Sequence, residues 1–307
     1  ALSAPQPFDF EVTVEPESGS TEQGGSVAAT VTVRLISGSP EVVALSVSGL
    51  PSGASASLSQ QSGLPTFTST MVIATSQSTP AGTYTITVTG TGGGLSRSAT
   101  YTLAVSAETY TVTFTQNGLP SGVEWSVTFG GQTKSSTGPT ITFTVPAGTY
   151  SWSASSPITG GLGVRYVASP ASGSINAPSQ TEQLITYATE YQWIFSASGL
   201  SSDASGTVVV VDGVSYSYST LPATFWWRSG STHNYAYQEY VGSTASGKRY
   251  ANHSPPSGTV TVSGSNNLSP SYHAEYQLAV AVSPSGAGSV SLSPSSADGY
   301  YDAGTSV

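Results

Sequence analysis

The sequence predicts an all-β protein in which β-sandwich domains follow one another in an elongated array. Three observations lead to this fold class. Residues Tyr110 to Gln192 and Tyr191 to Gln277 are imperfect copies of one module of roughly 80 residues. Short segments of alternating apolar and polar residues are separated by Gly- and Pro-rich turns, as in strands with one buried face. No segment carries the apolar i, i+3, i+4, i+7 pattern of a substantial helix.

Matched motifs recur in the same order in both copies. The first copy contains Gly118-Leu119, Thr128-Phe129-Gly130-Gly131, Thr142-Phe143-Thr144-Val145, Gly163-Val164-Arg165-Tyr166 and Ala188-Thr189-Glu190-Tyr191-Gln192. The second copy contains Gly199-Leu200, Val211-Asp212-Gly213, Thr224-Phe225-Trp226-Trp227, Gly247-Lys248-Arg249-Tyr250 and Ala274-Glu275-Tyr276-Gln277. The spacing between matched residues grows from 81 at the first glycine to 84 at the tyrosine, as small loop insertions would make it.

The repeat and the turn signals divide the chain into five parts. We expect an N-terminal extension at residues 1–7, a first module at 8–106, a second module at 108–189, a third module at 190–275 and a partial β module at 276–307. Short linkers are expected near residues 106–108, 187–190 and 273–275. The last part offers too few strands for a stable sandwich, so either the native chain continues past Val307 or strands of another molecule complete it.

Alternation marks five strands of the first module in chain order. They are expected at residues 10–14, 27–33, 43–47, 71–73 and 84–88, with turns at 24–25, 49–53, 80–82 and 92–94. Many short strands with such punctuation predict a β-sandwich of about 100 residues. In the third module, Asp212-Gly213 is predicted to form a hairpin turn, as Gly130-Gly131 does in the second.

The composition excludes several classes of function. Only 7% of the 307 residues are charged, the net charge is −9, and Lys and Arg total 7, so no basic surface is available for nucleic acid or an anionic membrane. No run of 18 apolar residues exists, which excludes a membrane span by helix. The chain has no Cys and therefore no disulfide or thiolate metal site. Its hydroxyl-rich surface with few carboxylates predicts tolerance of acid and suits an exterior location.

No catalytic, cofactor or metal site is predicted. The chain lacks a Gly-x-Ser-x-Gly elbow and the paired Asp-Thr/Ser-Gly signature, so no residue is assigned to catalysis. His233, His253 and His273 are spaced by 20 residues and match no metal-binding motif. Asp298 and Asp302 alone fall short of the oxygen ligands that Ca²⁺ requires.

Trp226 and Trp227 lie in the densest aromatic cluster, with Phe225, Tyr235, Tyr237 and Tyr240. Neighbouring residues of a strand point to opposite faces, so at most one of the two tryptophans joins the core. The other is predicted to fill a contact between modules or subunits, with sugar binding as the alternative. The recurring pairs Arg165-Tyr166 and Arg249-Tyr250 are interpreted as a cation–π or strand-edge feature of the module.

Further candidate sites lie near both ends of the chain. Phe8, Phe10, Val12 and Val14 alternate in the N-terminal segment and could complete the open sheet of a neighbouring molecule by strand donation. Asn252-His253-Ser254 and Asn267-Leu268-Ser269 are sequons for N-glycosylation at Asn252 and Asn267.

Several motifs resemble those of known families. The segments Gln23-Gly24-Gly25-Ser26, Leu45 to Gly53 and Thr79 to Tyr84 resemble immunoglobulin-like modules of prokaryotic secreted and surface proteins. Gly118 to Val127, followed by Val145 to Tyr150, is similar to tandem modules of archaeal surface proteins and of thermopsin-like protease tails. Residues 276–307 resemble divergent internalin-type repeats. The resemblance implies immunoglobulin-like sandwiches and a cell-surface location, and no particular activity.

These observations favour a non-catalytic structural subunit of an extracellular surface filament, stalk or sheath, assembled by strand donation. The expected partners are further copies of the chain, end to end, and cell-surface glycans. The alternatives are an accessory or adhesive tail of a larger secreted hydrolase and an adhesin that binds glycans through the aromatic residues at 225–240.

Overall fold

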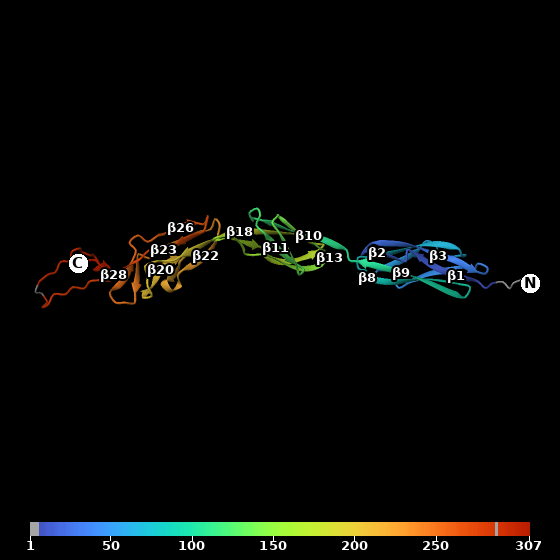
Figure 1. Ribbon diagram of the computed structural model, residues 1–307, viewed down its shortest axis with the longest axis horizontal. Helices are drawn as coiled ribbons and strands as arrows, with labels where there is room; N and C mark the ends of the chain where they lie inside the picture. Colours follow the sequence, from blue (N-terminus) through green and yellow to red (C-terminus); the bar gives the residue numbers. More distant parts are fainter. Residues whose placement is uncertain (1–5, 286–287) are drawn as a thin grey trace, which may run out of the picture. The chain divides into compact units, whose positions relative to one another are not determined.

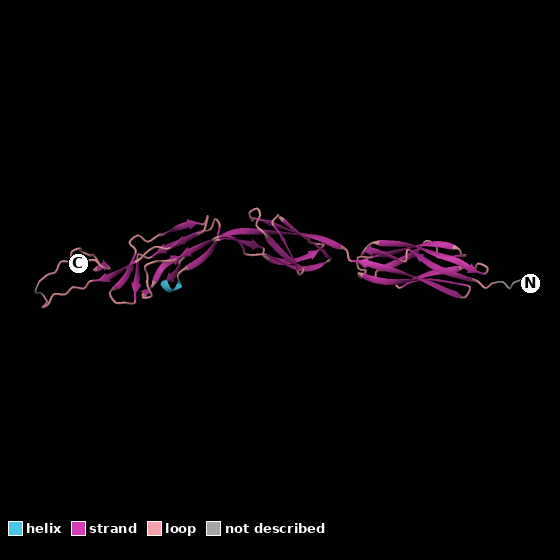
Figure 2. Ribbon diagram, viewed as in Figure 1, coloured by secondary structure: helices cyan, strands magenta, loops and turns pink. Residues whose placement is uncertain are grey.

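The computed structural model describes residues 6–285 and 288–307, and this part of the chain is almost entirely β (Figure 2). The described residues contain one short 3-10 helix, η1 (Tyr218–Thr220), and no helix long and apolar enough to cross a membrane. Residues 1–5 of the expected N-terminal extension lie outside the described residues. The all-β class predicted from the alternation is therefore confirmed.

The chain forms two compact units. The first contains Ala1–Val112, Phe143–Thr149 and Asn176–Thr181, and the second contains Thr113–Thr142, Tyr150–Ile175 and Glu182–Val307. The first module lies wholly in the first unit, and the third module lies wholly in the second.

The first module is a sandwich of two sheets around one core (Figure 1). The first sheet has the order β1 (Asp9–Glu15), β3 (Ser26–Ser37), β7 (Phe67–Thr75) and β5 (Ala54–Leu58). The second has the order β2 (Ser18–Glu22), β9 (Leu95–Ser106), β8 (Gly82–Gly92), β4 (Val43–Ser48) and β6 (Ser62–Gly63). Val31 and Val33 from one sheet and Ile86, Val88 and Leu103 from the other are fully buried in the shared core. Each of the five strands expected from alternation is present.

The strands from β10 to β18 form two further sheets. One has the order β13 (Thr140–Pro146), β10 (Thr109–Asn117), β18 (Glu182–Phe195), β16 (Val164–Ser169) and β15 (Ile158–Gly161). The other has the order β12 (Gln132–Ser136), β11 (Trp125–Phe129), β14 (Gly148–Ala154) and β17 (Ser172–Ala177). The ring of Phe114 from β10 lies edge-on to the rings of Phe129 and Trp152, each with centroids 5.4 Å away, so side chains of the two sheets meet in one core.

The third module repeats this construction. One sheet has the order β19 (Ala204–Ser205), β24 (Tyr240–Ser243), β25 (Lys248–Ala251), β28 (His273–Gln277) and β29 (Tyr300–Asp302). The other has the order β21 (Val214–Ser217), β20 (Thr207–Val211), β23 (Thr232–Tyr237) and β26 (Ser257–Thr261). Two more strands, β22 (Ala223–Arg228) and β27 (Asn266–Leu268), pair with β18. The predicted hairpin at Asp212-Gly213 joins β20 to β21, with φ angles of 47° and 81° at its two turn residues.

One topological feature is common to the three modules. An early strand pairs in parallel with a late strand: β2 with β9, β10 with β18, and β18 with β27. Other neighbouring strands are antiparallel, for example β3 with β7 and β8 with β9. This arrangement in tandem two-sheet sandwiches is the immunoglobulin-like architecture that the sequence predicts.

Strand β18 belongs to both the second and the third module. The linker expected at 187–190 is absent, because residues Glu182–Phe195 form one strand (Figure 1). Glu190 and Tyr191 pair with β16 on one side and with β22 on the other, so hydrogen bonding continues across the predicted boundary. The third expected linker, at 273–275, likewise lies in β28.

The segment after residue 276 contributes one strand to the third module. Strand β29 pairs antiparallel with β28, in the register Glu275 to Asp302, Tyr276 to Tyr301 and Gln277 to Tyr300. The sequence predicts a separate partial sandwich here, whereas the described residues of this segment place their strand at the edge of the preceding module's sheet.

Candidate functional site

The recurring arginine forms the same cross-strand ion pair in both repeat copies. Arg165 on β16 is in register with Glu190 on β18, and Arg249 on β25 is in register with Glu275 on β28. The Nη2 of Arg165 lies 2.7 Å from Glu190 Oε2, and the Nε of Arg249 lies 2.6 Å from Glu275 Oε2. The second pair is the more buried, with side-chain exposures of 17% for Arg249 and 6% for Glu275.

An aromatic ring from a strand later in the chain covers each arginine. The Cζ of Arg165 lies 4.5 Å from the ring centroid of Trp226 on β22, and that of Arg249 lies 4.0 Å from the ring centroid of Tyr300 on β29. Trp226 is in register with Gln192, and Tyr300 is in register with Gln277. We call these two sets, Arg165–Glu190–Trp226 and Arg249–Glu275–Tyr300, the arginine clamps. Strand β29 thus pairs with the last strand of the third module, β28, as β22 pairs with the last strand of the second module, β18.

Further contacts reinforce the second clamp. The Nη2 of Arg249 lies 2.6 Å from Asp298 Oδ2, and its Cζ lies 3.8 Å from the ring centroid of Tyr240. Burial by itself lowers the pKa of Arg249, but the hydrogen bonds to Glu275 and Asp298 outweigh it and raise the pKa. Hydrogen bonds from the Tyr300 backbone N–H, from Arg249 and from Ser296 lower the pKa of Asp298 to about 2. Both groups are therefore charged at neutral pH.

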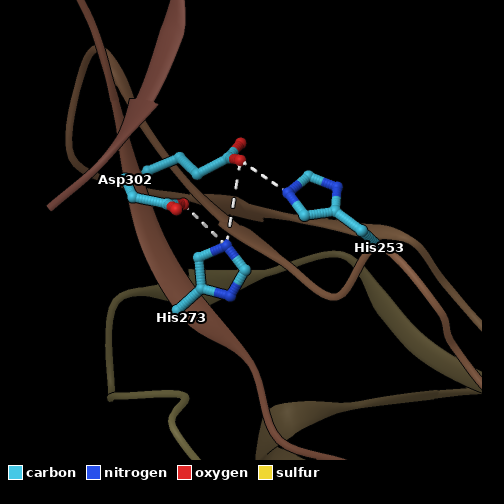
Figure 3. A group of neighbouring side chains, drawn as sticks. His253, His273 and Asp302 are labelled. Carbon is cyan, nitrogen blue, oxygen red and sulfur yellow. Dashed lines mark ion pairs between the residues drawn. The ribbon is translucent and has the colours of Figure 1, made fainter. Parts of the chain in front are cut away.

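Next to this clamp, two histidines and two carboxylates converge (Figure 3). The Nε2 of His253 lies 3.1 Å from Glu275 Oε1, and the Nε2 of His273 lies 2.8 Å from Asp302 Oδ1 and 3.9 Å from Glu275 Oε1. One ligand atom from each of the four residues lies within 4.8 Å of the others. We call this set the His–carboxylate cluster. Imidazole nitrogens and carboxylate oxygens are donors that could hold a divalent transition-metal ion.

The sheet register brings the cluster together. His273 and Glu275 alternate on β28 and so share one face. Asp302 is directly opposite Glu275 in the β28–β29 pair. His253 follows Ala251, the end of β25, which is in register with His273. The cluster borders a surface cavity of about 410 Å³, whose lining includes Tyr240, Arg249, Asp298 and Tyr300.

The structure brings two of the three histidines, His253 and His273, close together, although their spacing in the sequence predicts no metal site. The third, His233, lies elsewhere: its ring stacks on Trp227 with centroids 3.9 Å apart, and its Nδ1 lies 2.7 Å from Asp212 Oδ2. The signal available in the sequence was His273-Ala274-Glu275, two potential ligands on one face of a predicted strand.

Trp226 and Trp227 point to opposite faces, as the alternation predicts. Trp227 is buried in the third module's core, with 7% of its surface exposed. Trp226 is half-buried, and one face of its ring is covered by Arg165. Trp226 therefore joins β16 of the second module to β22 of the third, and that face is not available to stack on a sugar.

The four N-terminal candidates for strand donation lie within their own module. Phe10, Val12 and Val14 are buried in its core, and β1 is paired with β3 along its whole length. Phe8 is half-buried and stacks on Phe10, with ring centroids 5.5 Å apart. Strand donation by this segment would first require β1 to leave its own sheet.

The two sequon asparagines differ in exposure. Asn252 is half-buried, and its Oδ1 accepts a hydrogen bond from the Ser254 N–H at 3.0 Å. Asn267 is exposed in β27. Asn267 is consequently the more accessible acceptor for a glycan.

An internal polar network in the third module escaped the sequence analysis. Asp203 accepts hydrogen bonds from Lys248 Nζ at 2.8 Å and from Ser243 Oγ at 2.6 Å, and it also contacts the hydroxyls of Ser201 and Tyr250. These hydrogen bonds, that from Lys248 first, hold the pKa of Asp203 far below its usual range. The network links β24 and β25 to the loop before β19, the edge strand of the same sheet.

No protein-family model matches the chain, and no curated protein matches it. Among solved structures, domains 4 and 5 of the S-layer protein SbsC are 20% identical over 33% of this chain and 54% of that chain, with a TM-score of 0.26. The D1-D4 ectodomain fragment of ICAM-5 is 10% identical over 83% of this chain and 98% of that chain, with a TM-score of 0.24. The N-terminal eight Ig domains of Down Syndrome Cell Adhesion Molecule are 11% identical over 85% and 41%, with a TM-score of 0.21. The chain thus spans about half of the S-layer fragment, and these likenesses concern the fold alone.

Proposed function

We propose that the chain is a non-catalytic structural element of an extracellular surface assembly, such as a stalk, sheath or filament, and that it acts as a stiff spacer. The observation that carries the proposal is the continuity of β18, which forms a strand of both the second and the third module. Because β18 pairs with β16 as far as Tyr191 and with β22 from Glu190 onward, bending at the joint would break sheet hydrogen bonds.

The first arginine clamp supports the same role. Arg165 comes from the second module, Trp226 from the third, and Glu190 from the shared strand. The contact fixes the two modules through side chains as well as through the backbone. The second arginine clamp, between β25, β28 and β29 of the third module, repeats this contact, which indicates that both repeat copies use the same way of attaching the strand that follows.

Composition supports an exterior location. The hydroxyl-rich surface with 7% charged residues has few carboxylates whose protonation would weaken the fold in acid. One serine lies next to a histidine: Ser231 Oγ is 2.9 Å from His233 Nε2, and His233 Nδ1 is 2.7 Å from Asp212 Oδ2. Ser231 Oγ donates its hydrogen to the Arg228 carbonyl at 2.6 Å, and the His233 ring is stacked on Trp227, so this group serves the packing of the third module. The carboxylates found together, Glu275 and Asp302, are engaged by Arg249 and His273.

The stiffness of the joint can be measured by pulsed electron–electron resonance between two spin labels. Because the chain has no Cys, each introduced Cys is the only site that the label can modify. Labels at Ser121→Cys in the second module and Ser263→Cys in the third report the distance across the joint, and both serines are exposed. The pair Ser246→Cys and Ser263→Cys lies within the third module and is the control. We expect equally narrow distance distributions for both pairs.

A variant with two glycines inserted between Thr189 and Glu190 supplies the flexible reference, because it interrupts β18. A native distribution across the joint as broad as that of this insertion variant would contradict the spacer role. Location is tested separately by labelling intact source cells with a membrane-impermeant reagent. Protein that is found only inside the cells would exclude a surface assembly.

A further inference from the structure

We propose that the His–carboxylate cluster binds one divalent transition-metal ion of the Zn²⁺ class, and that the ion fastens β29 to the third module. This inference goes beyond the spacer role and does not depend on it. The ligands are His253 Nε2, His273 Nε2, Glu275 Oε1 and Asp302 Oδ1, which all lie within 4.8 Å of one another.

The donor spacing fits a four-coordinate ion. Zn–N and Zn–O bonds of about 2.0–2.2 Å place tetrahedral ligand atoms about 3.3–3.6 Å apart. Three of the separations between these atoms are 2.8, 3.1 and 3.9 Å, and the others do not exceed 4.8 Å. Small side-chain rotations of His253, His273 and Asp302, which are 44–61% exposed, would suffice to equalise them.

The buried carboxylate is oriented for this task. Arg249 takes up Oε2 of Glu275 at 2.6 Å and leaves Oε1 directed at the two imidazoles. The carboxylate of Glu239 lies 3.8 Å from Nδ1 of His253, on the side of the ring opposite the proposed ion. At 3.8 Å this contact is electrostatic and too long for a hydrogen bond, so it adds negative charge beside the ring without fixing its tautomer.

The local charge also favours a cation. Glu275 and Asp298 pair with the guanidinium of Arg249, while Glu239 lies next to His253 and Asp302 next to His273. The carboxylates exceed the guanidinium in charge, so a bound dication would offset the excess. Two imidazole ligands favour Zn²⁺ and related ions over Ca²⁺ and Mg²⁺, which prefer oxygen ligands.

The consequence for the fold follows from where the ligands originate. Three of them come from the body of the third module, on β28 and just after β25, and Asp302 comes from β29. Strand β29 has only three residues. An ion bound by all four residues would therefore tie a short edge strand to the sheet at the point where the second arginine clamp also acts.

The test uses the full chain after treatment with EDTA and transfer to chelator-free buffer at neutral pH. Zn²⁺ binding is measured by competition with a chromophoric chelator, and Co²⁺ is used as a spectroscopic probe of coordination. The variants are His253→Ala, His273→Ala and Asp302→Asn, and Glu124→Gln, an exposed carboxylate of the second module, is the matched control. Near-ultraviolet circular dichroism in EDTA establishes that each variant is folded.

We expect one Zn²⁺ per chain and a Co²⁺ absorption spectrum typical of four- or five-coordinate sites. Each histidine variant should weaken binding by more than the roughly 10- to 100-fold that loss of an outer partner of a ligand costs. Zn²⁺ should slow amide hydrogen exchange in Tyr300–Asp302 of the native chain and leave Asp302→Asn unaffected. Should His273→Ala fail to fold, His253→Ala and Asp302→Asn decide, because both alter exposed side chains.

Two results would overturn the proposal. One is the absence of saturable binding at millimolar Zn²⁺, which would leave the cluster as a set of ion pairs. The other is binding whose affinity is unchanged in both His253→Ala and Asp302→Asn, which would place the metal elsewhere on the chain.

Discussion

The ring of Tyr300 covers the guanidinium of Arg249, with 4.0 Å between the ring centroid and Cζ. Trp226 covers Arg165 from the same register position of the second module's joint, at 4.5 Å. In both cases the arginine is also paired with a glutamate on the adjacent strand. In the second and third modules, the arginine of the repeated Arg-Tyr motif therefore links a later strand, β22 or β29, to the sheet that carries the arginine.

Replacing the covering ring should loosen β29. We expect Tyr300→Ala to cost about 0.5–2 kcal/mol, the range for a cation–π contact between exposed and desolvated settings. Hydrogen exchange of the β28–β29 amides, measured in EDTA, should accelerate. Tyr276→Ala removes an exposed ring from β28 itself and is the control. Equal exchange rates in Tyr300→Ala and the native chain would refute the role given to this ring.

The two clamp glutamates should differ in their contribution to stability. Glu275→Gln removes the buried partner of Arg249 and leaves only the more exposed Asp298 paired with it, so we expect a loss of about 1.5–3 kcal/mol in the free energy of unfolding. Glu190→Gln breaks the equivalent pair, whose side chains are 20–31% exposed, and should cost about 1 kcal/mol or less. Denaturant unfolding in EDTA measures both, and equal losses would show that burial does not set the difference.

Strands could be predicted where apolar and polar residues alternate strongly, and they could not be predicted where most side chains are small. Val27 to Val33 alternates apolar and polar residues and lies in β3. Strands β2 and β5 consist largely of Ser, Gly and Ala and carry no comparable signal. The continuity of β18 was missed because Ala188-Thr189-Glu190 resembles a linker in composition. Pairing on both of its sides, which composition does not encode, makes it a strand.

The first glycine of each repeat copy is required by a close backbone approach. A Cβ on Gly199, whose φ is +77°, would lie 1.8 Å from the carbonyl oxygen of Tyr272. A Cβ on Gly118 would likewise lie 2.2 Å from the carbonyl oxygen of Tyr187. We expect Gly199→Ala to cost about 3 kcal/mol or more. Gly213 also has a positive φ, but a Cβ added there would meet open space, so Gly213→Ala should cost about 1–2 kcal/mol. Thermal unfolding distinguishes them, and matching losses would mean that only the backbone conformation matters.

The His–carboxylate cluster could not be predicted from spacing. Its members lie at 253, 273, 275 and 302, and no metal motif spans such intervals. They meet because β25, β28 and β29 are neighbours in one sheet and because two register pairs, Ala251 with His273 and Glu275 with Asp302, align them. Prediction of this cluster would have required the strand order and register, whereas the aromatic clamp at least left a repeated motif.

The adjacent tryptophans should respond differently to truncation. Trp227→Ala empties part of the third module's core and should cost about 3–5 kcal/mol. Trp226→Ala removes the contact with Arg165 and should cost about 1 kcal/mol, with the third module still folded. Chemical unfolding measures the stability of each variant. If Trp226→Ala were as destabilising as Trp227→Ala, the ring would belong to the core rather than to the joint.

The Asp203 network should make the third module sensitive to acid. Hydrogen bonds from Lys248, Ser201, Ser243 and Tyr250 hold the folded-state pKa of Asp203 far below its unfolded value. The stabilisation is therefore fully present above the unfolded pKa, near about 3.9, and is lost as pH falls toward the folded pKa. The difference in unfolding free energy between the native chain and Asp203→Asn should be constant from about pH 6 to 8 and shrink below about pH 5. In the background of Lys248→Met, which removes the principal partner, this pH dependence should be much weaker. Denaturant titrations at closely spaced pH values measure both series, and a difference that stays constant down to pH 2 would show that Asp203 is not the titrating group.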